Sequence, residues 1–221
     1  MSRIVLKVGG AVAGEAATLA LALAQQHEVC VVHGAGPQIS AELERAGLEV
    51  RFVQGRRVTS RDALAVVRDS FAAVNAEVCA AIGPRAVPLF GDEIGLTAVH
   101  APELGHVGSP LPSSPPAVEN ALADGLVPVV APLGVGPLNV NADEAAAALA
   151  IGLGADKLLF VTDVPGLLLG GVVASKIGVT EAERLLAAGD LGGGIVPKLE
   201  AAVTAARGGV DATIGATAVV A

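Results

Sequence analysis

Lys7 occupies a position in the sequence that a simple surface role does not explain. It lies in a strand predicted at about 3–8, where apolar neighbours on both sides indicate burial of both faces. A buried ammonium group is unfavourable unless an anion or a carboxylate meets it. Gly9 and Gly10 follow directly, where the backbone can turn tightly and approach a ligand closely. We therefore expect an anion site at the end of this strand. The alternative is a lysine at a strand edge with its head in water.

Lys198 is the second unusual lysine, and it ends the segment Gly192-Gly-Gly-Ile-Val-Pro-Lys198. Pro197 predicts a helix start, which places Lys198 in the first turn of that helix. A cation there opposes the helix dipole by about 0.3–1 kcal/mol. An anion bound at the same helix end would turn this penalty into a binding interaction.

A small-residue turn, Gly34-Ala35-Gly36, joins a predicted strand to a predicted helix. Its backbone N–H groups, with the helix dipole behind them, suit a carboxylate or a phosphate. Ile39 stands where a dinucleotide fingerprint has its third glycine, and no lysine directly follows a glycine as in a P-loop. The alternative is a purely structural turn. We interpret His33, just before it, as a packed strand residue and not as a catalytic base.

The segment Leu138-Asn-Val-Asn-Ala-Asp143 opens another predicted helix. Asn139 or Asn141 can cap this helix, and Asp143 and Glu144 complement its dipole. Capping alone would account for all four polar residues. In the functional alternative, Asn139 and Asp143 point at the strand ends where Lys7 lies.

Composition limits the class of protein. The 221 residues carry a net charge of −8, which argues against nucleic acid or an anionic membrane as the main partner. No apolar run approaches the roughly 20 residues of a membrane span, and no secretory signal precedes the first strand. Cys30 and Cys79 lack CxxC or metal-ligand spacing, which predicts free thiols in a reducing cytoplasm.

Strand and helix patterns alternate along the whole chain. This predicts the α/β class, as a three-layer α/β/α sandwich with a central, mostly parallel sheet whose ligands lie beyond the carboxyl ends of the strands. We expect strands at 3–8, 29–33, 86–90, 127–131, 157–162, 210–214 and 217–220. We expect helices at 14–26, 38–47, 60–81, 116–124, 141–152, 180–188 and 197–207, a short β excursion at 50–58 and hairpin character within 91–116.

The motifs together resemble the amino-acid kinase family, and within it the branch that phosphorylates N-acetyl-L-glutamate. Seven segments carry the resemblance in register: Leu6-Lys-Val-Gly-Gly10, Val32-His-Gly-Ala-Gly-Pro37, Gly55-Arg-Arg-Val-Thr59, Glu103-Leu-Gly-His-Val-Gly108, Leu138-Asn-Val-Asn-Ala-Asp143, Thr162-Asp-Val-Pro-Gly166 and Gly193-Gly-Ile-Val-Pro-Lys198. Each segment is a weak signal by itself. The seven together, in order along nearly the whole chain, are specific.

The resemblance implies roles for individual residues. Lys7 and Lys198 would stabilise the transferring phosphoryl group, and Asp143 would orient both lysines. The acceptor would be held by Gly9, Gly10, Gly34, Ala35, Gly36, Arg57 and Asn139. ATP would be held by Asp163, Val164, Pro165, Gly166, Leu167, Leu168, Asp190, Leu191 and Gly192. Mg²⁺ would bind through the ATP phosphates, with no metal ligands from the protein. The chain would be a single domain, 1–221, with an acceptor-binding half at about 1–135 and a nucleotide-binding half at about 136–221.

The implied reaction belongs to arginine biosynthesis: the side-chain carboxylate of N-acetyl-L-glutamate takes the γ-phosphoryl group of ATP. A carboxylate with a pKa near ~4 is already ionised, so the reaction requires no general base. Arg57 would hold a substrate carboxylate, the alternative being an exposed arginine. Two other functions stay open: a kinase for aminoadipate or glutamate linked to a carrier protein, and a non-catalytic sensor with this fold.

The resemblance also suggests a homodimer with no nucleic-acid or membrane partner. The long helix at 60–81 would pair through a stripe of Ala63, Val66, Val67, Phe71 and Val74, unless those residues face the home sheet. Arginine-inhibited hexamers of the family carry an additional helix before the first strand. Only Met1 and Ser2 stand there in this chain, so we expect insensitivity to arginine.

Three features depart from the family pattern. Ala35 replaces a glycine, which is harmless if its φ is negative, because only its N–H is needed. The strand at 210–214 runs almost directly into the strand at 217–220, and the connection from Pro132 to Leu138 is short. We expect these losses to affect how fully the nucleotide pocket is enclosed.

Overall fold

The central element of the computed structural model, which describes residues 1–9 and 13–221, is an eight-stranded sheet. Its strand order is β14 (Lys176–Gly178), β16 (Thr217–Val220), β15 (Asp211–Ile214), β11 (Lys157–Val161), β1 (Arg3–Val8), β2 (Glu28–His33), β8 (Val127–Ala131) and β5 (Ala86–Phe90). All neighbouring strands are parallel except β15 and β16, which form an antiparallel hairpin. The predicted mostly parallel sheet is confirmed.

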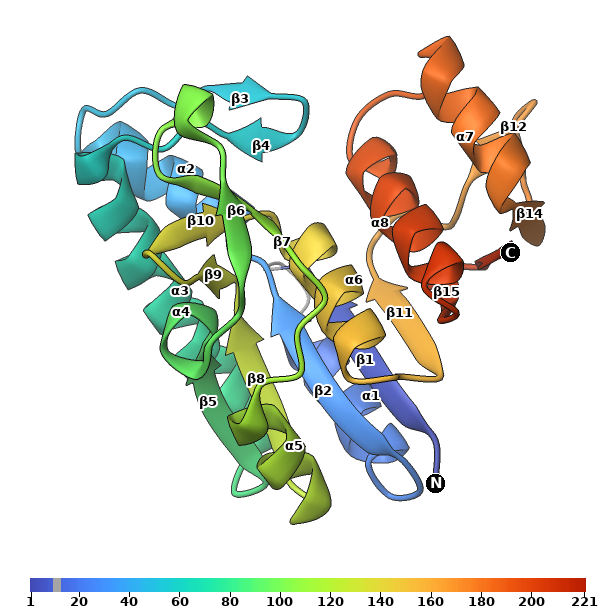
Figure 1. Ribbon diagram of the computed structural model, residues 1–221, viewed down its shortest axis with the longest axis horizontal. Coiled ribbons are helices and arrows are strands. Elements are labelled where there is room, and N and C mark those ends of the chain that lie inside the picture. The colour runs from blue at the N-terminus through green and yellow to red at the C-terminus, as the bar shows by residue number, and fades with distance from the viewer. Residues whose placement is uncertain (10–12) are drawn as a thin grey trace.

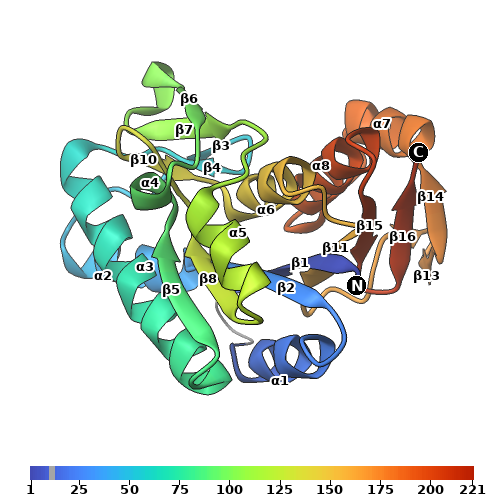
Figure 2. The ribbon, with the colours of Figure 1, turned by 60° about the horizontal axis from the view of Figure 1, so that its bottom comes forward.

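Helices cover both faces of this sheet, as the predicted three-layer sandwich requires (Figure 2). The helices are α1 (Ala13–Leu23), α2 (Gly36–Arg45), α3 (Arg61–Ile82), α4 (Gly91–Ile94), α5 (Pro116–Ala123), α6 (Ala142–Gly152), α7 (Val179–Ala188) and α8 (Ile195–Arg207). Helices α1 and α3 lie on one face, and α6 and α8 pack side by side on the other (Figure 2). Each parallel connection therefore buries the apolar stripe of its helix on the sheet.

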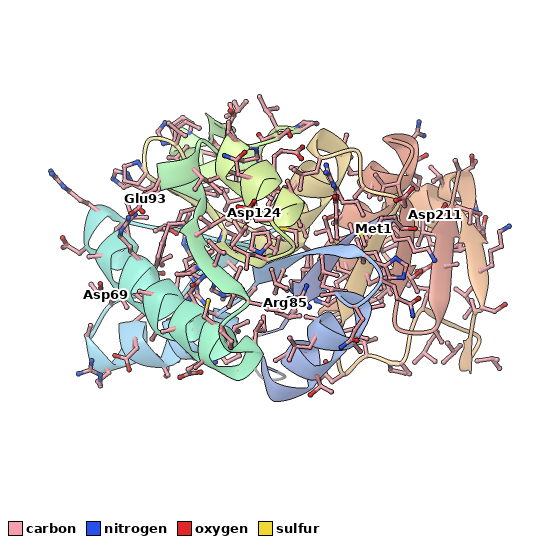
Figure 3. The ribbon with its side chains drawn as sticks, turned by 90° about the horizontal axis from the view of Figure 1, so that it is seen from below. Met1, Asp69, Arg85, Glu93, Asp124 and Asp211 are labelled. Carbon is pink, nitrogen blue, oxygen red and sulfur yellow. The ribbon has the colours of Figure 1, made fainter. Side chains whose placement is uncertain are left out.

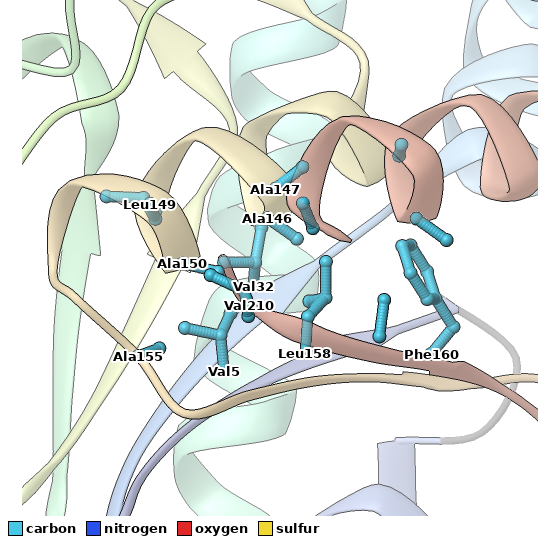
Figure 4. Close-up of a cluster of buried hydrophobic side chains, with 14 of the residues drawn as sticks. Val5, Val32, Ala146, Ala147, Leu149, Ala150, Ala155, Leu158, Phe160 and Val210 are labelled. Carbon is cyan, nitrogen blue, oxygen red and sulfur yellow. The ribbon is translucent and has the colours of Figure 1, made fainter. Parts of the chain in front are cut away.

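The two faces of β1 belong to two separate apolar clusters. Ile4, Leu6 and Val8 pack in the cluster that includes residues of α1 and α3. Val5 packs in the other cluster, beneath α6 and α8 (Figure 4). Since side chains alternate along a strand, Lys7 shares the face of Val5 and points toward α6 and α8.

Short strands build the region above the carboxyl ends of the sheet. A four-stranded sheet has the order β6 (Ala98–His100), β7 (Val107–Pro110), β10 (Leu138–Val140) and β9 (Leu133–Gly134), and two hairpins pair β3 (Phe52–Val53) with β4 (Arg56–Arg57) and β12 (Leu168–Leu169) with β13 (Val172–Val173). The predicted hairpin within 91–116 is the antiparallel β6–β7 pair. The sequence analysis did not predict β9, β10, β12, β13 or β14, because strands of two or three residues show no usable periodicity.

Helix α3 corrects the predicted dimer stripe. Its N-cap Ser60 accepts a hydrogen bond from the Ala63 N–H, 3.1 Å away, which fixes the start of the helix. Ala63, Val67, Phe71 and Val74 are buried in the home cluster and cannot form an external interface. The alternative reading of that stripe, packing on the home sheet, is the correct one.

The exterior of the molecule is acidic. Asp69, Asp124 and Asp211 are exposed and lie on different elements, well separated across the view in Figure 3. Cys30 and Cys79 are free thiols, as predicted. Within the described residues, no helix combines the length and the apolar composition that crossing a bilayer requires.

Candidate active site

Lys7, Asp143 and Lys198 meet at the carboxyl end of β1. The Lys7 Nζ lies 2.8 Å from Asp143 Oδ1, and the Lys198 Nζ lies 3.4 Å from Asp143 Oδ2. Lys7 and Asp143 are only 6% and 5% exposed. Burial lowers the pKa of Lys7 and the Asp143 carboxylate opposes that shift, while the charge of Lys198 adds to it. One carboxylate thus holds two cations, which leaves the group with an excess of positive charge.

Local sequence explains why these three residues converge. Lys7 faces α6 and α8 because of its register on β1. The Asn141 side chain caps α6, its Oδ1 accepting from the N–H groups of Asp143 at 2.8 Å and Glu144 at 3.2 Å. This cap holds Asp143 in the first turn, directly above the end of β1. The Asn141 alternative for the cap is therefore confirmed.

Helix α8 begins at Ile195, two residues before the predicted start at Pro197. Proline is tolerated anywhere in a first turn, because the N–H groups there have no acceptor within the helix. Pro197 therefore indicates the first turn of α8 but not its first residue. Lys198 completes this first turn, and Gly194 is the N-cap. The lysine still lies near the positive end of the helix dipole. The Asp143 carboxylate or a bound anion offsets this unfavourable interaction.

The Gly34–Gly36 turn leads into α2, whose N-terminus opens toward Lys7. A Cβ placed on Gly34 would lie 4.0 Å from the Lys7 Nζ. Ala35 is the N-cap with φ −143°, so the departure from glycine costs no left-handed strain. Unpaired amides of a helix start suit an anion.

Arg57 lies on β4 and is 6% exposed. Its Nη2 donates to Ser40 Oγ at 2.8 Å and to the Gly36 carbonyl at 3.1 Å, and its Cζ lies 4.5 Å from the Phe52 ring centroid. The other terminal nitrogen, Nη1, is buried without a hydrogen-bond partner among the described residues. Burial lowers the pKa of Arg57. A buried guanidinium with a spare donor is a receptor for an anion, not an exposed arginine.

Asn139 lies on β10 and is buried. Its Nδ2 donates to Thr59 Oγ1 at 3.0 Å, and its backbone N–H donates to the His106 carbonyl at 2.9 Å. The first bond connects β10 to the segment that follows β4, and the second connects it to the residue that precedes β7. Asn139 therefore faces Arg57's side of the site and does not cap α6.

All of these groups line one cavity of about 380 Å³. Its wall includes the predicted residues Lys7, Gly34, Ala35, Gly36, Arg57, Asn139, Asp143 and Lys198. Gly9 follows β1 outside this wall, with no atom within 4 Å of the place where its Cβ would stand. Gly10 lies outside the described residues. In an acidic protein, a cavity lined by two lysines and two arginines against one aspartate suits a multiply charged anion.

Several wall residues were not predicted: Ile39, Phe52, Phe71 and Val107 contribute apolar surface, and Arg56 contributes a second arginine. In the sequence, Arg56 belongs to the segment Gly55-Arg-Arg-Val-Thr59. No local signal marks it as a wall residue, because alternation along β4 alone would place it on the opposite side from Arg57.

The predicted nucleotide residues do not line this cavity and lie in two segments of the chain. Residues 163–166 follow β11, where the Gly166 φ of 144° and the approach of its Cβ position to within 2.6 Å of Thr217 Oγ1 admit only glycine. The Leu167 side chain packs in the core and its N–H donates to Thr217 Oγ1 at 2.8 Å, so this residue lines no pocket with its side chain. Leu168 is exposed on β12. Residues 190–192 form the loop between α7 and α8.

His33 is a core residue, as interpreted. It is fully buried, its ring meets Phe71 edge-on at 5.9 Å, and its Nε2 lies 3.1 Å from Asn75 Nδ2. Burial lowers the pKa of His33 to about 4. It is absent from the cavity wall and stays neutral near pH 7.

Comparison with known proteins agrees with this geometry. The model of the amino acid kinase family matches residues 2–215. The acetylglutamate kinase of Rubrobacter xylanophilus is 42% identical over 97% of this chain and 88% of its own length, and that of Dinoroseobacter shibae is 37% identical over 96% and 80%.

Solved structures show the same fold. The smu.665 protein of Streptococcus mutans superposes with a TM-score of 0.86 at 26% identity, over 99% of this chain and 98% of its own. Carbamate kinase from Giardia lamblia superposes with a TM-score of 0.71 at 14% identity, over 99% and 98%, which shows the fold alone. By a sequence match along nearly its whole length and by a sheet that places two lysines on one aspartate, this chain belongs to the amino acid kinase family.

Proposed function

We propose that this protein transfers the γ-phosphoryl group of ATP to the side-chain carboxylate of N-acetyl-L-glutamate, a step in arginine biosynthesis. Two relatives named acetylglutamate kinase, at 42% and 37% identity, support the acceptor. The observation that carries the chemistry is the Lys7–Asp143–Lys198 group in a cavity that is also lined by Arg57, whose buried Nη1 has no hydrogen-bond partner among the described residues. Mere binding of an amino acid does not require two lysines on one buried aspartate.

The acceptor has two carboxylates, and the cavity offers two places for negative charge. Arg57 would receive the α-carboxylate through Nη1, while Phe52 shields the guanidinium from water. The amides at the start of α2 and the Asn139 side chain would hold the acetylated amino group. This arrangement directs the side-chain carboxylate toward Lys7.

The transfer needs no proton movement. A carboxylate oxygen of the acceptor forms a bond to the γ-phosphorus, the bond from that phosphorus to the β–γ bridging oxygen breaks, and ADP leaves with the electron pair. The barrier is repulsion between two anions. Lys7 and Lys198 would reduce it at the transferring group, and Asp143 would hold both ammonium groups in place. His33 takes no part, since it lies outside the cavity.

Mg²⁺ is expected to accompany ATP. Among the described residues, no three His, Cys, Asp or Glu side chains gather into a metal-ligand group. Mg²⁺ in kinases is usually held by one or two carboxylates together with the phosphates of the nucleotide. When bound, the ion neutralises phosphate charge.

We infer that the nucleotide lies against the half of the chain at about 136–221. The supporting residues are Asp163 to Gly166 after β11 and Asp190 to Gly192 before α8. Both loops lie on the α8 side of the sheet's carboxyl ends, where parallel α/β sheets bind ligands. The half at about 1–135 would then contribute most acceptor contacts.

The test is release of ADP from ATP and Mg²⁺ with free N-acetyl-L-glutamate, with glutamate, aminoadipate and a carrier-linked glutamate as comparisons. We expect turnover with free N-acetyl-L-glutamate. Turnover restricted to the carrier-linked substrate would replace this proposal by the carrier-protein kinase. Nucleotide and acceptor binding without turnover would replace it by the sensor.

We also infer a homodimer through α3, but through its outer face. That face presents small exposed side chains at Ala65, Ala72, Ala76 and Ala80, which would allow close approach of a second helix. Light scattering of the protein and of Ala76→Arg tests this inference. A monomeric parent protein, or a variant that still dimerises, would contradict it.

A further inference from the structure

The β3–β4 hairpin carries Arg57 but has little backbone support of its own. Its strands have two residues each and pair only with each other. An isolated two-stranded hairpin of this size is not independently stable. The backbone is anchored just after β4, where the Thr59 N–H donates to the Leu104 carbonyl at 2.9 Å and the Thr59 carbonyl accepts from the His106 N–H at 2.7 Å. Side-chain contacts to other elements add to this anchor and orient the two strands over the cavity.

Arg56 makes such a contact with α6. Its Nε and Nη2 donate to the two carboxylate oxygens of Glu144, both at 2.8 Å, and its Nη1 donates to Ser109 Oγ at 2.8 Å. The Arg56 and Glu144 side chains are 28% and 25% exposed. A bidentate guanidinium–carboxylate pair fixes both distance and orientation. The guanidinium groups of the two neighbouring residues therefore reach different helices, Arg56 reaching Glu144 of α6 and Arg57 reaching Ser40 of α2.

Further contacts join the hairpin to the same place. Asn141, the N-cap of α6, donates from Nδ2 to the Gly55 carbonyl at 3.4 Å. A Cβ on Gly55 would lie 3.7 Å from the Cβ of Pro197, in the first turn of α8. Figure 1 shows the hairpin projecting from the α2 side toward α8. The hairpin thus reaches the first turns of both helices that hold the Lys7 site.

We propose that the Arg56–Glu144 ion pair is a positioning device for the acceptor. Glu144 directly follows Asp143 in α6, as Arg56 directly precedes Arg57 in β4. The pair therefore fixes the position of Arg57, which would bind the acceptor, relative to Asp143, whose carboxylate lies between the two lysines. The expected effect on KM rests on the proposed function. The attachment of the hairpin to α6 does not depend on that function.

The kinetic test compares Arg56→Gln, Glu144→Gln and the double variant. Glutamine at 144 keeps the shape and the capping ability of the first turn. We expect each single variant to raise KM for N-acetyl-L-glutamate about fivefold to tenfold, with kcat and KM for ATP within about twofold. The double variant should resemble the single ones, because both lose the same interaction. Arg51→Gln is the matched control: its ion pair with Glu49, at 3.9 Å, is exposed and stays within the same connection.

Hydrogen exchange of the hairpin amides, at residues 52–57, provides a readout without turnover. We expect faster exchange in the Arg56 and Glu144 variants than in the parent protein and Arg51→Gln. A raised KM with unchanged exchange would overturn the proposal and make Arg56 a direct acceptor ligand. Additive effects in the double variant, or an unchanged KM in both single variants, would also overturn it. If the parent protein fails to phosphorylate N-acetyl-L-glutamate, the proposed function fails, and the exchange data alone decide whether the tether exists.

Discussion

Replacing Asp143 by asparagine removes the carboxylate shared by Lys7 and Lys198 while keeping the shape of the side chain. At 2.8 Å and an effective dielectric constant of about 20, the attraction of Lys7 to this carboxylate is about 6 kcal/mol before desolvation. Breaking a buried ion pair by removing one partner costs about 3–5 kcal/mol of stability. The remaining ammonium group of Lys7 would then lie buried beside a second cation.

Loss of a proton from Lys7 limits this penalty. With an ordinary lysine pKa of 10.5, neutralising the side chain costs about 4 kcal/mol at about pH 7.5 and about 1.4 kcal/mol at about pH 9.5. In the variant, the folded-state pKa of Lys7 falls further below the unfolded value. The unfolded chain then binds more protons in this range, so the stability of the variant rises with pH.

The assay is denaturant unfolding of the parent protein and Asp143→Asn at both pH values. We expect the difference in unfolding free energy to be about 3–4 kcal/mol at about pH 7.5 and to shrink to about 1–2 kcal/mol at about pH 9.5. Asp124→Asn, at an exposed position at the end of α5, is the control and should differ by less than about 0.5 kcal/mol at either pH. A difference that is independent of pH, or below about 1 kcal/mol at the lower pH, would refute the argument that Asp143 keeps Lys7 charged.

Three other predictions concern single side chains. Lys7→Ala and Lys198→Ala should each lower kcat about 10²–10³-fold with little change in acceptor affinity measured by calorimetry, and an unchanged kcat removes that lysine from the mechanism. Arg57→Ala should raise KM for N-acetyl-L-glutamate about 10–100-fold; a change in KM for ATP alone would place Arg57 in the wrong half of the site. His33 has its pKa lowered from 6.5 to about 4, so the parent protein should lose up to about 3 kcal/mol of stability as pH falls through that window. His33→Gln should lose less in acid unfolding curves, and parallel curves would contradict this reading.

The order of the helices and strands was predictable because long elements carry periodicity. Nearly all strands of the central sheet and all its long helices appear where alternation and apolar runs placed them. The errors have physical causes. Pro197 indicates the first turn of α8 and not its first residue. The apolar stripe of α3 packs on the central sheet of the same chain, where it is buried without a second subunit. Unpredicted strands of two or three residues, such as β12 and β13, form because of their pairing partners and not because of their composition.

The sequence by itself determined the kinds of groups available: a lysine in an apolar strand, a lysine at a helix start, a small-residue turn and an aspartate behind a capping asparagine. These follow from local rules of burial, dipoles and caps. The tertiary structure alone decided that one carboxylate lies between both lysines, that Arg57 keeps a buried spare donor, and that Arg56 grips Glu144. The ion pairs join residues 55 to 136 positions apart. The register of β1 and the packing of α6 on α8 set them, and local sequence contains no record of either.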